Sequence, residues 1–451
     1  MLEELNERTT GFTVSTSEDK GRICVANQAF EPGMVIFNEK AFVYASEIPD
    51  RCLACSEEHT CEHCPKLLGG RLNCPEELAG DLDDLAEELR YLDGINTLDR
   101  ARCWIQCLLM YRTDPKTLSP VERLTCANLP RCLDAVQVAR GLLPGLFPDS
   151  LGDDAAARLL GVLNTNSHAL EEVEGSGLFL LACMMEHSCV PNCSFTTYGD
   201  KLWLTAIAPI KTGDSLSIDY GNNYYTPTVD RQADLEETYG FVCNCKGCSV
   251  LPDLSRAFHC PTEGCEGKVC PCGDGGESSG ERLPSEWECL KCGHQCAEVE
   301  IGVMLVAEEG LAQALEEAEV EGVEDIEILV SEARVVHPGH CVAFWALDNV
   351  AKFLSQDPTM AEEAERTWSR VVAAMDEVLP ELHHERVVYY DALAQARVMA
   401  GDLEGAREAY WNAHRVSVLV SGADCPPTRD IKALAQSPPT TPEELLDRYN
   451  C

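Results

Sequence analysis

The sequence EHSCVPNC at residues 186–193 decides the fold, together with YGFVCNCKGC at residues 239–248. The second stretch ends in a Cys-x-Cys-x2-Cys pattern formed by Cys243, Cys245 and Cys248. This pattern supplies three thiolates, one fewer than the tetrahedral shell of a structural zinc ion requires, and Cys189 in the first stretch is the natural fourth donor. A shared ion would hold the loop of the first stretch against the aromatic residues of the second. The alternative, a redox cluster or a set of buried thiols, suits this spacing less well than metal does.

Length and composition limit the class of protein. The chain has 451 residues, a hydrophobic fraction of 45% and 26 cysteines, which is enough for about two or three globular domains. The N-terminal sequence MLEELNERTTG is polar and acidic, and no apolar run reaches the length of a membrane span. We therefore expect a soluble protein of the cytoplasm, the nucleus or both, without membrane contact. Disulfides are disfavoured in these compartments, which leaves metal ligation as the main explanation for so many cysteines.

The charge limits the partners. With 35 basic and 76 acidic residues, the formal charge is −41. Such a chain repels the phosphates of nucleic acids, so we expect no direct nucleic acid binding. It would attract basic protein segments instead, although the same acidic residues could simply keep a helical surface soluble. We expect the chain to act as a monomer.

The pattern of apolar residues divides the chain into β-rich and helical parts. Residues 11–44 and 178–220 favour strands, whereas residues 76–163 have helical spacing, with a capping box at Ser119-Pro120-Val121-Glu122 that predicts a helix start. Residues 243–296 are rich in Cys, Gly and Pro and predict a small metal-held module. From Val299 onward the chain is helical. The segments 385–400 and 402–420 are typical of a helical-hairpin repeat of the tetratricopeptide kind, or of an ordinary antiparallel bundle.

Two further cysteine clusters have the spacing of zinc ligands. The first contains Cys52, Cys55, Cys61 and Cys64, with His59 and His63 as possible substitutes for a thiol. The second contains Cys260, Cys265, Cys289 and Cys292, with Cys270, Cys272 and Cys296 as spare thiols. Its paired spacing is typical of a zinc ribbon, whose role would be structural or, less commonly, to grip a partner. We predict about two to three zinc ions in all.

Three motifs in a fixed order carry a resemblance: His-Ser-Cys-x-Pro-Asn beginning at His187, Ser-Ile-Asp-Tyr ending at Tyr220, and the Cys-x-Cys-x2-Cys pattern. They resemble the SET domain of protein lysine methyltransferases, and nearly the whole chain looks like the SET-and-MYND branch of that family. The resemblance implies an α+β fold with a β-rich SET domain whose sequence is split, small zinc modules, and an all-α C-terminal domain similar to tetratricopeptide arrays.

The resemblance also implies a division into domains. Residues 1–50 would form the N-terminal part of the SET domain, 51–75 a degenerate MYND-like zinc module, 76–160 a helical insert, 161–225 the SET core, 226–250 the post-SET zinc site, 251–300 a zinc-ribbon-like insert, and 301–451 the helical C-terminal domain. The MYND-like module is shortened because the second half of its motif does not follow Cys64.

Residue roles follow from the same resemblance, position by position. The family's cofactor, S-adenosylmethionine, would be contacted by Lys20, Gly21, Arg22, Asn166, Glu186, His187, Tyr220 and Phe241. Within that set, Tyr220 is similar to the catalytic tyrosine beside the transferring methyl group. His168 and Tyr239 would line the channel for the substrate lysine. Two positions depart from the family pattern: Glu186 stands where most members have asparagine, and His168 stands where many have phenylalanine.

The implied activity is methyl transfer to lysine side chains of histone or non-histone proteins, and the residue types suit it. Transfer from a sulfonium is an in-line displacement that needs alignment and a dry channel. The target lysine must first lose a proton, which from a pKa of ~10.4 costs about 4 to 5 kcal/mol at pH 7. Desolvation and the sulfonium charge lower that pKa, while the Tyr220 hydroxyl and backbone carbonyls would stabilise the charge on the amine. Because of Glu186 and His168, the alternative is a catalytically weak or inactive zinc scaffold that mediates protein–protein interaction.

Overall fold

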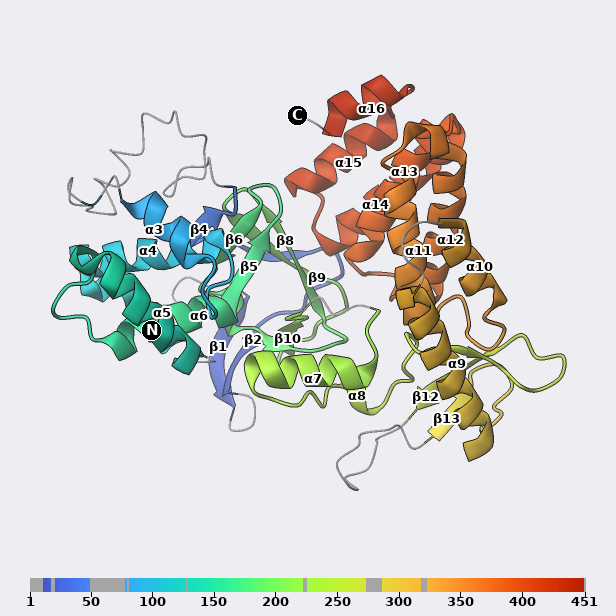
Figure 1. Ribbon diagram of the computed structural model, residues 1–451, viewed down its shortest axis with the longest axis horizontal. Coiled ribbons are helices and arrows are strands. Elements are labelled where there is room, and N and C mark those ends of the chain that lie inside the picture. The colour runs from blue at the N-terminus through green and yellow to red at the C-terminus, as the bar shows by residue number, and fades with distance from the viewer. Residues whose placement is uncertain are drawn as a thin grey trace.

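The computed structural model describes residues 11–17, 21–48, 78, 81–126, 129–221, 225–272, 286–317 and 323–449. The predicted cluster of Cys52, Cys55, Cys61 and Cys64, its alternative ligands His59 and His63, and the predicted cofactor contact Lys20 lie outside the described residues. The described chain forms a helical lobe, a central β-rich region and a column of C-terminal helices (Figure 1). In these ranges no helix combines the length and the apolar character needed to cross a membrane.

The first sheet brings the two ends of the β-rich part together. Its strands lie in the order β1 (Phe12–Ser17), β2 (Gly21–Ala26), β10 (Ser215–Ile218) and β7 (Glu186–His187). β1 and β2 form an antiparallel hairpin, β10 is antiparallel to β2, and β7 is parallel to β10. This pairing places His187 opposite Ile218. The EHSC sequence therefore lies beside the strand that leads to Tyr220.

Two three-stranded sheets complete the central region. One has the order β3 (Val35–Lys40), β9 (Lys201–Ala206), β8 (Cys193–Tyr198), and the other β4 (Val43–Ser46), β6 (Gly175–Leu178), β5 (Ser167–Leu170). In β9, the apolar residues Leu202, Leu204 and Ala206 recur at every second position and are fully buried. Gly175 permits the close pairing of β6 with β4, because a side-chain carbon there would lie 1.9 Å from the carbonyl oxygen of Ala45.

The helical lobe covers the β4–β6–β5 sheet. Its helices are α3 (Leu82–Leu89), α4 (Leu98–Thr113), α5 (Leu129–Leu142) and α6 (Asp153–Asn166). Helix α4 lies at the centre of the lobe, and even its Arg102 is 1% exposed. That guanidinium donates hydrogen bonds to the carbonyl oxygens of Ser46, the last residue of β4, and of Ile48. The lobe and the central sheets therefore share one core.

The capping box at Ser119-Pro120-Val121-Glu122 does not start a helix, so this prediction was wrong. Val121–Arg123 forms a short 3-10 turn without a side-chain cap, and the next helix begins at Leu129. The carbonyl groups of this segment are bound from outside: Arg158 of α6 donates to the carbonyl oxygens of Glu122 and Leu124. Tertiary hydrogen bonds have replaced those that a helix would have made.

The C-terminal half begins with α7 (Thr228–Tyr239) and α8 (Lys246–Ser249), followed by a small sheet of β11 (Phe258–His259), β12 (Lys268–Cys272) and β13 (Glu286–Cys289). The helical column then contains α9 (Glu298–Glu317), α10 (Val323–Glu332), α11 (Cys341–Leu354), α12 (Ala361–Val378), α13 (Glu385–Met399), α14 (Leu403–Val420), α15 (Pro426–Gln436) and α16 (Pro442–Tyr449). From α11 to α15 each helix packs on the next. Helices α13 and α14 match the hairpin expected at 385–420, with Asp402 capping α14 by accepting from the Gly405 N–H.

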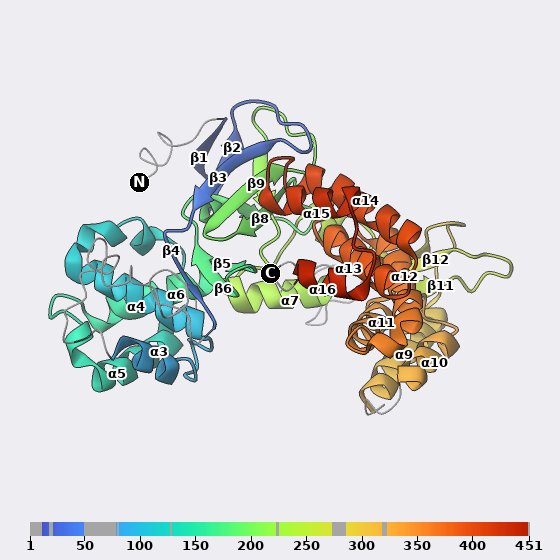
Figure 2. The same ribbon diagram turned by 90° about the horizontal axis from the view of Figure 1, so that it is seen from above.

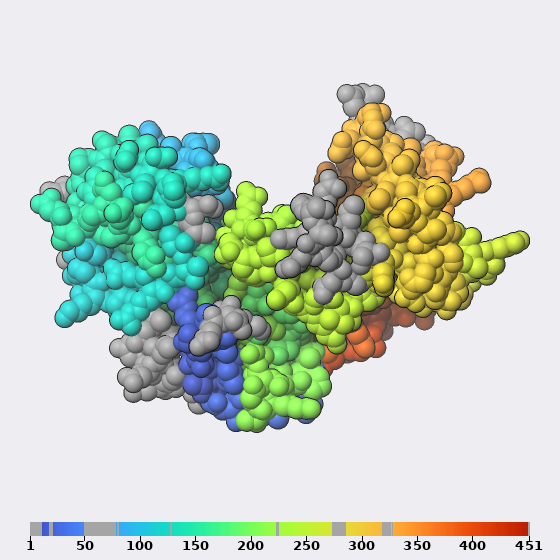
Figure 3. Space-filling model, turned by 90° about the horizontal axis from the view of Figure 1, so that it is seen from below, coloured from blue at the N-terminus to red at the C-terminus, as the bar shows by residue number. Residues whose placement is uncertain are grey.

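The column and the central sheets are in direct contact. Seen from above, α14 and α15 lie next to β8 and β9 (Figure 2). Ser421, just after α14, forms a buried hydrogen bond of 2.7 Å with Thr196 of β8. Seen from below, the helical lobe and the C-terminal half stand on either side of the segment that contains α7, with a broad hollow between them (Figure 3).

A substitution at Gly422 tests the contact between the C-terminal helices and the central sheets. It has a φ of +91°, and a side-chain carbon there would lie 2.5 Å from Cγ2 of Val35 in β3. Gly422→Ala should destabilise the protein through the left-handed backbone, about 1 to 2 kcal/mol, and through overpacking, a further ~1 to 3 kcal/mol. Gly213 is the matched control, because its φ is +95° with no atom within 4 Å of the added carbon. Denaturant unfolding should show the larger loss for Gly422→Ala, and equal losses for the two variants would contradict the tight contact.

Candidate active site

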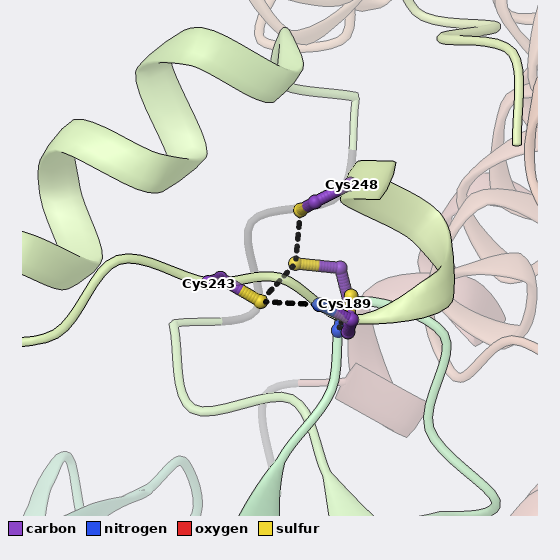
Figure 4. A group of neighbouring side chains, drawn as sticks. Cys189, Cys243 and Cys248 are labelled. Carbon is purple, nitrogen blue, oxygen red and sulfur yellow. Dashed lines mark hydrogen bonds between the residues drawn. The ribbon is translucent and has the colours of Figure 1, made fainter. Parts of the chain in front are cut away.

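Four cysteine sulfurs meet where the β7 loop approaches α8. Cys189 Sγ lies 3.5 Å from Cys248 Sγ and 3.9 Å from Cys243 Sγ, and the Cys189 N–H donates to Cys245 Sγ at 3.3 Å. All four sulfurs lie within 4.8 Å of one another. Figure 4 shows Cys189, Cys243 and Cys248 pointing toward one another, with Cys248 on the short helix α8. The structure thus brings together the predicted fourth donor and the Cys-x-Cys-x2-Cys triplet.

This donor set fits a zinc ion. Tetrahedral zinc with Zn–S bonds of about 2.3 Å places its sulfurs roughly 3.8 Å apart, which agrees with the observed spacing. Two of the thiols favour ionisation, because hydrogen bonds from Cys189 and its neighbours lower the pKa of Cys243 and bring that of Cys245 to about 5, whereas the same network raises the pKa of Cys189 and Cys248. Several thiolates this close repel one another unless a cation lies between them. The cluster can therefore hold a zinc ion.

His187 connects this cluster to Tyr220. Its side chain is 2% exposed, and its Nδ1 accepts a hydrogen bond of 3.1 Å from the Tyr220 backbone N–H. The proton must therefore be on Nε2, which lies 3.2 Å from Cys189 Sγ and donates to it. A metal ligand and the predicted catalytic tyrosine are thus held by the same imidazole.

A cavity of about 860 Å³ opens on the other side of Tyr220. Of the residues that the sequence assigned to cofactor or substrate, those that line it are Gly21, Arg22, Asn166, His168, Tyr220, Tyr239 and Phe241. Glu186 and His187 are not part of its lining. Glu186 instead lies near Cys24 and Tyr220, where its charge adds to the effect of burial in raising the pKa of both groups.

Three aromatic residues form one wall of the cavity. The ring centroids of Tyr220 and Tyr239 are 5.0 Å apart, and Phe241 lies 6.5 Å from Tyr220 in an edge-to-face arrangement. The Tyr220 hydroxyl donates to the carbonyl oxygen of Met185 at 2.5 Å. Burial raises the pKa of Tyr220, so its phenol is neutral at physiological pH. Its oxygen can still accept a hydrogen bond from a group in the cavity.

The end of the cavity near the β1–β2 turn is polar and positively charged. Arg22, Arg123 and Arg158 all line it. The Asn166 amide donates to the carbonyl oxygens of Thr125 and Val162, so its own side-chain oxygen is the atom left for a ligand. Arg22 is fixed by hydrogen bonds to the carbonyl oxygen of Arg123, which ends the 3-10 turn, and to the Thr125 hydroxyl. This end suits a ligand that carries both a carboxylate and an ammonium group.

The sequence analysis missed the part of the lining that comes from the C-terminal helices. His383, His384, Glu385 and Pro427 line the cavity, as does Phe195 of β8. The four C-terminal residues belong to no recognisable motif, and their approach to the cavity depends on the packing of α14 against β8 and β9. No local signal in the sequence could have found them.

The four cysteines of the predicted zinc ribbon, Cys260, Cys265, Cys289 and Cys292, also lie close together. Cys260 Sγ lies 3.7 Å from Cys292 Sγ, and Cys265 Sγ lies 3.8 Å from Cys289 Sγ, with all four within 4.8 Å. Gly267 is required beside them, because a side-chain carbon there would lie 2.6 Å from Cys289 Sγ. Of the spare thiols, Cys296 lies near His294 and Glu300, whereas Cys270 and Cys272 belong to none of the metal-type groups among the described residues. This cluster can hold a second zinc ion.

Comparison with known proteins agrees with this architecture. The family model of the SET domain matches residues 21–221. The human N-lysine methyltransferase SMYD2 is 25% identical over 258 residues, which cover 52% of this chain and 59% of the relative. A SET and MYND domain-containing protein of Dictyostelium discoideum is 30% identical over 165 residues, 32% of this chain and 47% of the relative. The Drosophila melanogaster SET domain-containing protein SmydA-8 is 23% identical over 322 residues, 64% of this chain and 67% of the relative.

The sheets, the cysteine clusters and these matches define a SET-domain protein with accessory zinc-type modules. Residues 21–221 match the SET domain, and the chain is similar to proteins named for SET and MYND domains, as its motifs predicted. The match to human SMYD2 spans little more than half of that relative's length. Among solved structures, the SET domain of LSMT bound to lysine and AdoHcy aligns over 100% of this chain and 97% of that chain, with 14% identity and a TM-score of 0.29. That TM-score is too low to compare the two molecules further.

Cys189→Ser tests the shared metal site. Replacing one of four thiolates should lower the zinc content by about one ion per chain, because a tetrahedral structural site tolerates no missing donor. The metal content of the purified protein, measured by mass spectrometry, checks this. Cys425→Ser is the control, since Cys425 is a buried thiol outside the metal-type groups of the described residues. Unchanged zinc in Cys189→Ser would contradict the assignment of Cys189 as a ligand.

Proposed function

We propose that this protein is a protein lysine methyltransferase that uses S-adenosylmethionine. The observation that carries the proposal is the meeting of Tyr220, Tyr239 and Phe241 on one cavity, with Tyr220 held to the four-sulfur cluster through His187. The SET-domain match and the similarity to a named N-lysine methyltransferase support the same reaction.

The cofactor would occupy the polar end of the cavity. Arg22 and the Asn166 side-chain oxygen offer partners for the carboxylate and the ammonium of its methionine part, and Gly21 leaves room because no atom lies within 4 Å of an added side-chain carbon. Phe241 offers an aromatic face nearby. When bound, S-adenosylmethionine supplies an electrophilic methyl group on a positively charged sulfur.

The aromatic wall would hold the target lysine. Aromatic side chains exclude water from the amine, and desolvation lowers the pKa of a lysine, so the loss of its proton becomes less costly than the ~4 to 5 kcal/mol required in water at pH 7. The Tyr220 oxygen accepts a hydrogen bond from the amine and orients its lone pair. The same oxygen stabilises the positive charge that develops on the nitrogen during transfer.

The substrates would be proteins with lysine in a basic segment. The chain has a net charge of −41, and Glu171 and Glu385 line the cavity, so a basic segment is attracted both at long range and at the site. Histone tails are one example of such a segment, and basic non-histone proteins are another. We propose a monomer acting in the cytoplasm, the nucleus or both, without direct contact to nucleic acid or membrane.

A labelling experiment tests the activity. The protein is incubated with S-adenosylmethionine that carries a labelled methyl group, together with purified core histones or a cell extract. We expect labelled protein bands whose modified residues are lysines when identified by mass spectrometry. If no band is labelled and calorimetry detects no binding of S-adenosylmethionine or S-adenosylhomocysteine, the protein is instead a zinc-held scaffold for protein contacts.

Tyr220→Phe tests the role of the hydroxyl. Its loss should lower kcat by about 100-fold or more, because the group orients the amine and stabilises charge in the transition state. Binding of S-adenosylhomocysteine should be retained, which shows that the cavity is intact. Tyr198→Phe is the control, since Tyr198 lies at the end of β8 and is 36% exposed. A Tyr220→Phe variant as active as the unchanged protein would remove this role.

A further inference from the structure

A further group of metal-type side chains lies where the zinc ribbon meets α9. It consists of His294, Cys296 and Glu300. One donor atom of each residue lies within 4.8 Å of the other two, and all three residues are partly exposed. An imidazole nitrogen, a thiolate and a carboxylate oxygen are the donor types that zinc takes in proteins. None of these three residues lines the cavity, so the proposed reaction gives them no role.

Hydrogen bonds to the backbone hold the three residues in place. The His294 carbonyl oxygen accepts from the Cys289 N–H at 2.9 Å, and the Cys296 N–H donates to a carbonyl oxygen of β13 at 2.9 Å. Glu300 is in the first turn of α9, where its Oε2 accepts from the Ala297 N–H at 2.8 Å. Two of the donors are therefore fixed by the ribbon sheet, and the third is fixed by the start of the helix.

The spacing of the nitrogen and the oxygens fits coordination of one ion. His294 Nε2 lies 3.2 Å from Oε1 and 3.1 Å from Oε2 of Glu300. Two donors bound at about 2.0 Å to a tetrahedral zinc ion lie roughly 3.3 Å apart. An ion pair between His294 and Glu300 would have the same spacing, but a pair this exposed contributes at most about 1 kcal/mol. Such a pair would also give no role to the thiol of Cys296.

The ribbon cysteines favour a cation at this place. Burial raises the pKa of Cys296 to about 11, and the charges of Glu300 and of three ribbon thiols, Cys260, Cys289 and Cys292, add to the effect. These groups are therefore close enough to Cys296 for their charges to act on it. A zinc ion bound to four thiolates keeps a net negative charge, which attracts a second dication nearby.

We propose that His294, Cys296 and Glu300 form an additional binding site for a divalent cation, and that zinc is the ion whose chemistry fits it best. Three protein donors leave one tetrahedral position for water, in contrast to the closed shell of a four-cysteine site. The partial exposure of the donors lets the ion enter and leave. The ion therefore exchanges more readily than the ribbon ion, and it fastens the first turn of α9 to the ribbon.

The first arm of the experiment counts ions. The full chain is purified with zinc, dialysed against a weak chelator that removes only loosely held metal, and titrated with zinc in competition with a zinc-sensitive dye. The unchanged protein should take up about one ion per chain more than Cys296→Ser. The variant should bind this ion more than ~100-fold more weakly, because the loss of even an outer-shell partner costs about 10- to 100-fold in metal affinity.

Two further variants complete this arm. Glu300→Gln keeps an oxygen that can accept from the Ala297 N–H but removes the carboxylate, so it should weaken the same ion, and it decides the question if Cys296→Ser does not fold. Cys272→Ser is the matched control, since Cys272 is a partly exposed thiol outside the metal-type groups of the described residues. Equal uptake by Cys296→Ser and the unchanged protein overturns the proposal. Loss of a tightly held ion in Cys296→Ser also overturns it, because Cys296 would then belong to the ribbon site.

The second arm identifies the donors. Co²⁺ replaces zinc in the titration, and a thiolate bound to Co²⁺ gives a charge-transfer absorption in the near ultraviolet. This band should grow with the loosely held ion in the unchanged protein and in Cys272→Ser, and it should be weaker in Cys296→Ser by the share of one site. If the unchanged protein takes up this cobalt without the band, exposed carboxylates hold the ion and the proposal is wrong.

Discussion

The meeting of four sulfurs at Cys189, Cys243, Cys245 and Cys248 is the constraint on which the cavity depends. The segment that carries Tyr239 and Phe241 has little else to hold it, since the only fully buried side chain of α7 is Leu235. Burial of one leucine contributes about 2 to 3 kcal/mol, whereas a structural zinc site contributes about 10 to 16 kcal/mol of binding free energy. A zinc ion bound to the four sulfurs would therefore contribute more than side-chain burial to the position of the aromatic wall. Gly247 allows α8 to approach the loop that carries Cys189, because a side-chain carbon at Gly247 would lie 2.7 Å from Cγ2 of Val190.

The second cysteine cluster supports the opposite side of the cavity. The ribbon sheet packs on α9 and α11 in a small core of its own. A buried ionic group fixes this contact: Glu308 of α9 accepts hydrogen bonds from Arg256 at 2.8 and 3.2 Å and lies 3.2 Å from His340, which caps α11. Burial opposes the ionisation of Glu308, but the hydrogen bonds from His340 and Arg256 outweigh it and lower its pKa to about 2. Helix α11 packs on α12, and α12 packs on α13. The first residue of α13, Glu385, lines the cavity.

The sequence predicted the parts of the site that depend on local chemistry. Metal ligands must have a fixed spacing, so both described cysteine clusters could be found from the sequence, and the β-rich and helical parts followed from their periodicity. Two kinds of structural feature were not predicted from the sequence. The turn at Val121–Arg123 was taken for a helix start because the carbonyl contacts of Arg158 come from a distant helix. His383 and Glu385 were missed because only the packing of α14 on β8 and β9 brings the C-terminal helices to the cavity. Tertiary contacts of this kind leave no local pattern.

Residues of both charge signs line the cavity, and this fits the proposed reaction. Arg22, Arg123 and Arg158 surround one end, and Glu171 and Glu385 line the same cavity. A single polar ligand would not need both. Two ligands would, if one presents a carboxylate and the other approaches as a basic protein segment. The neutral aromatic wall around Tyr220 lines the same cavity, and a low local polarity there would strengthen hydrogen bonds to a reacting amine. Under the proposed function, the charged residues would attract the two ligands into the cavity, while methyl transfer would take place beside the uncharged aromatic wall.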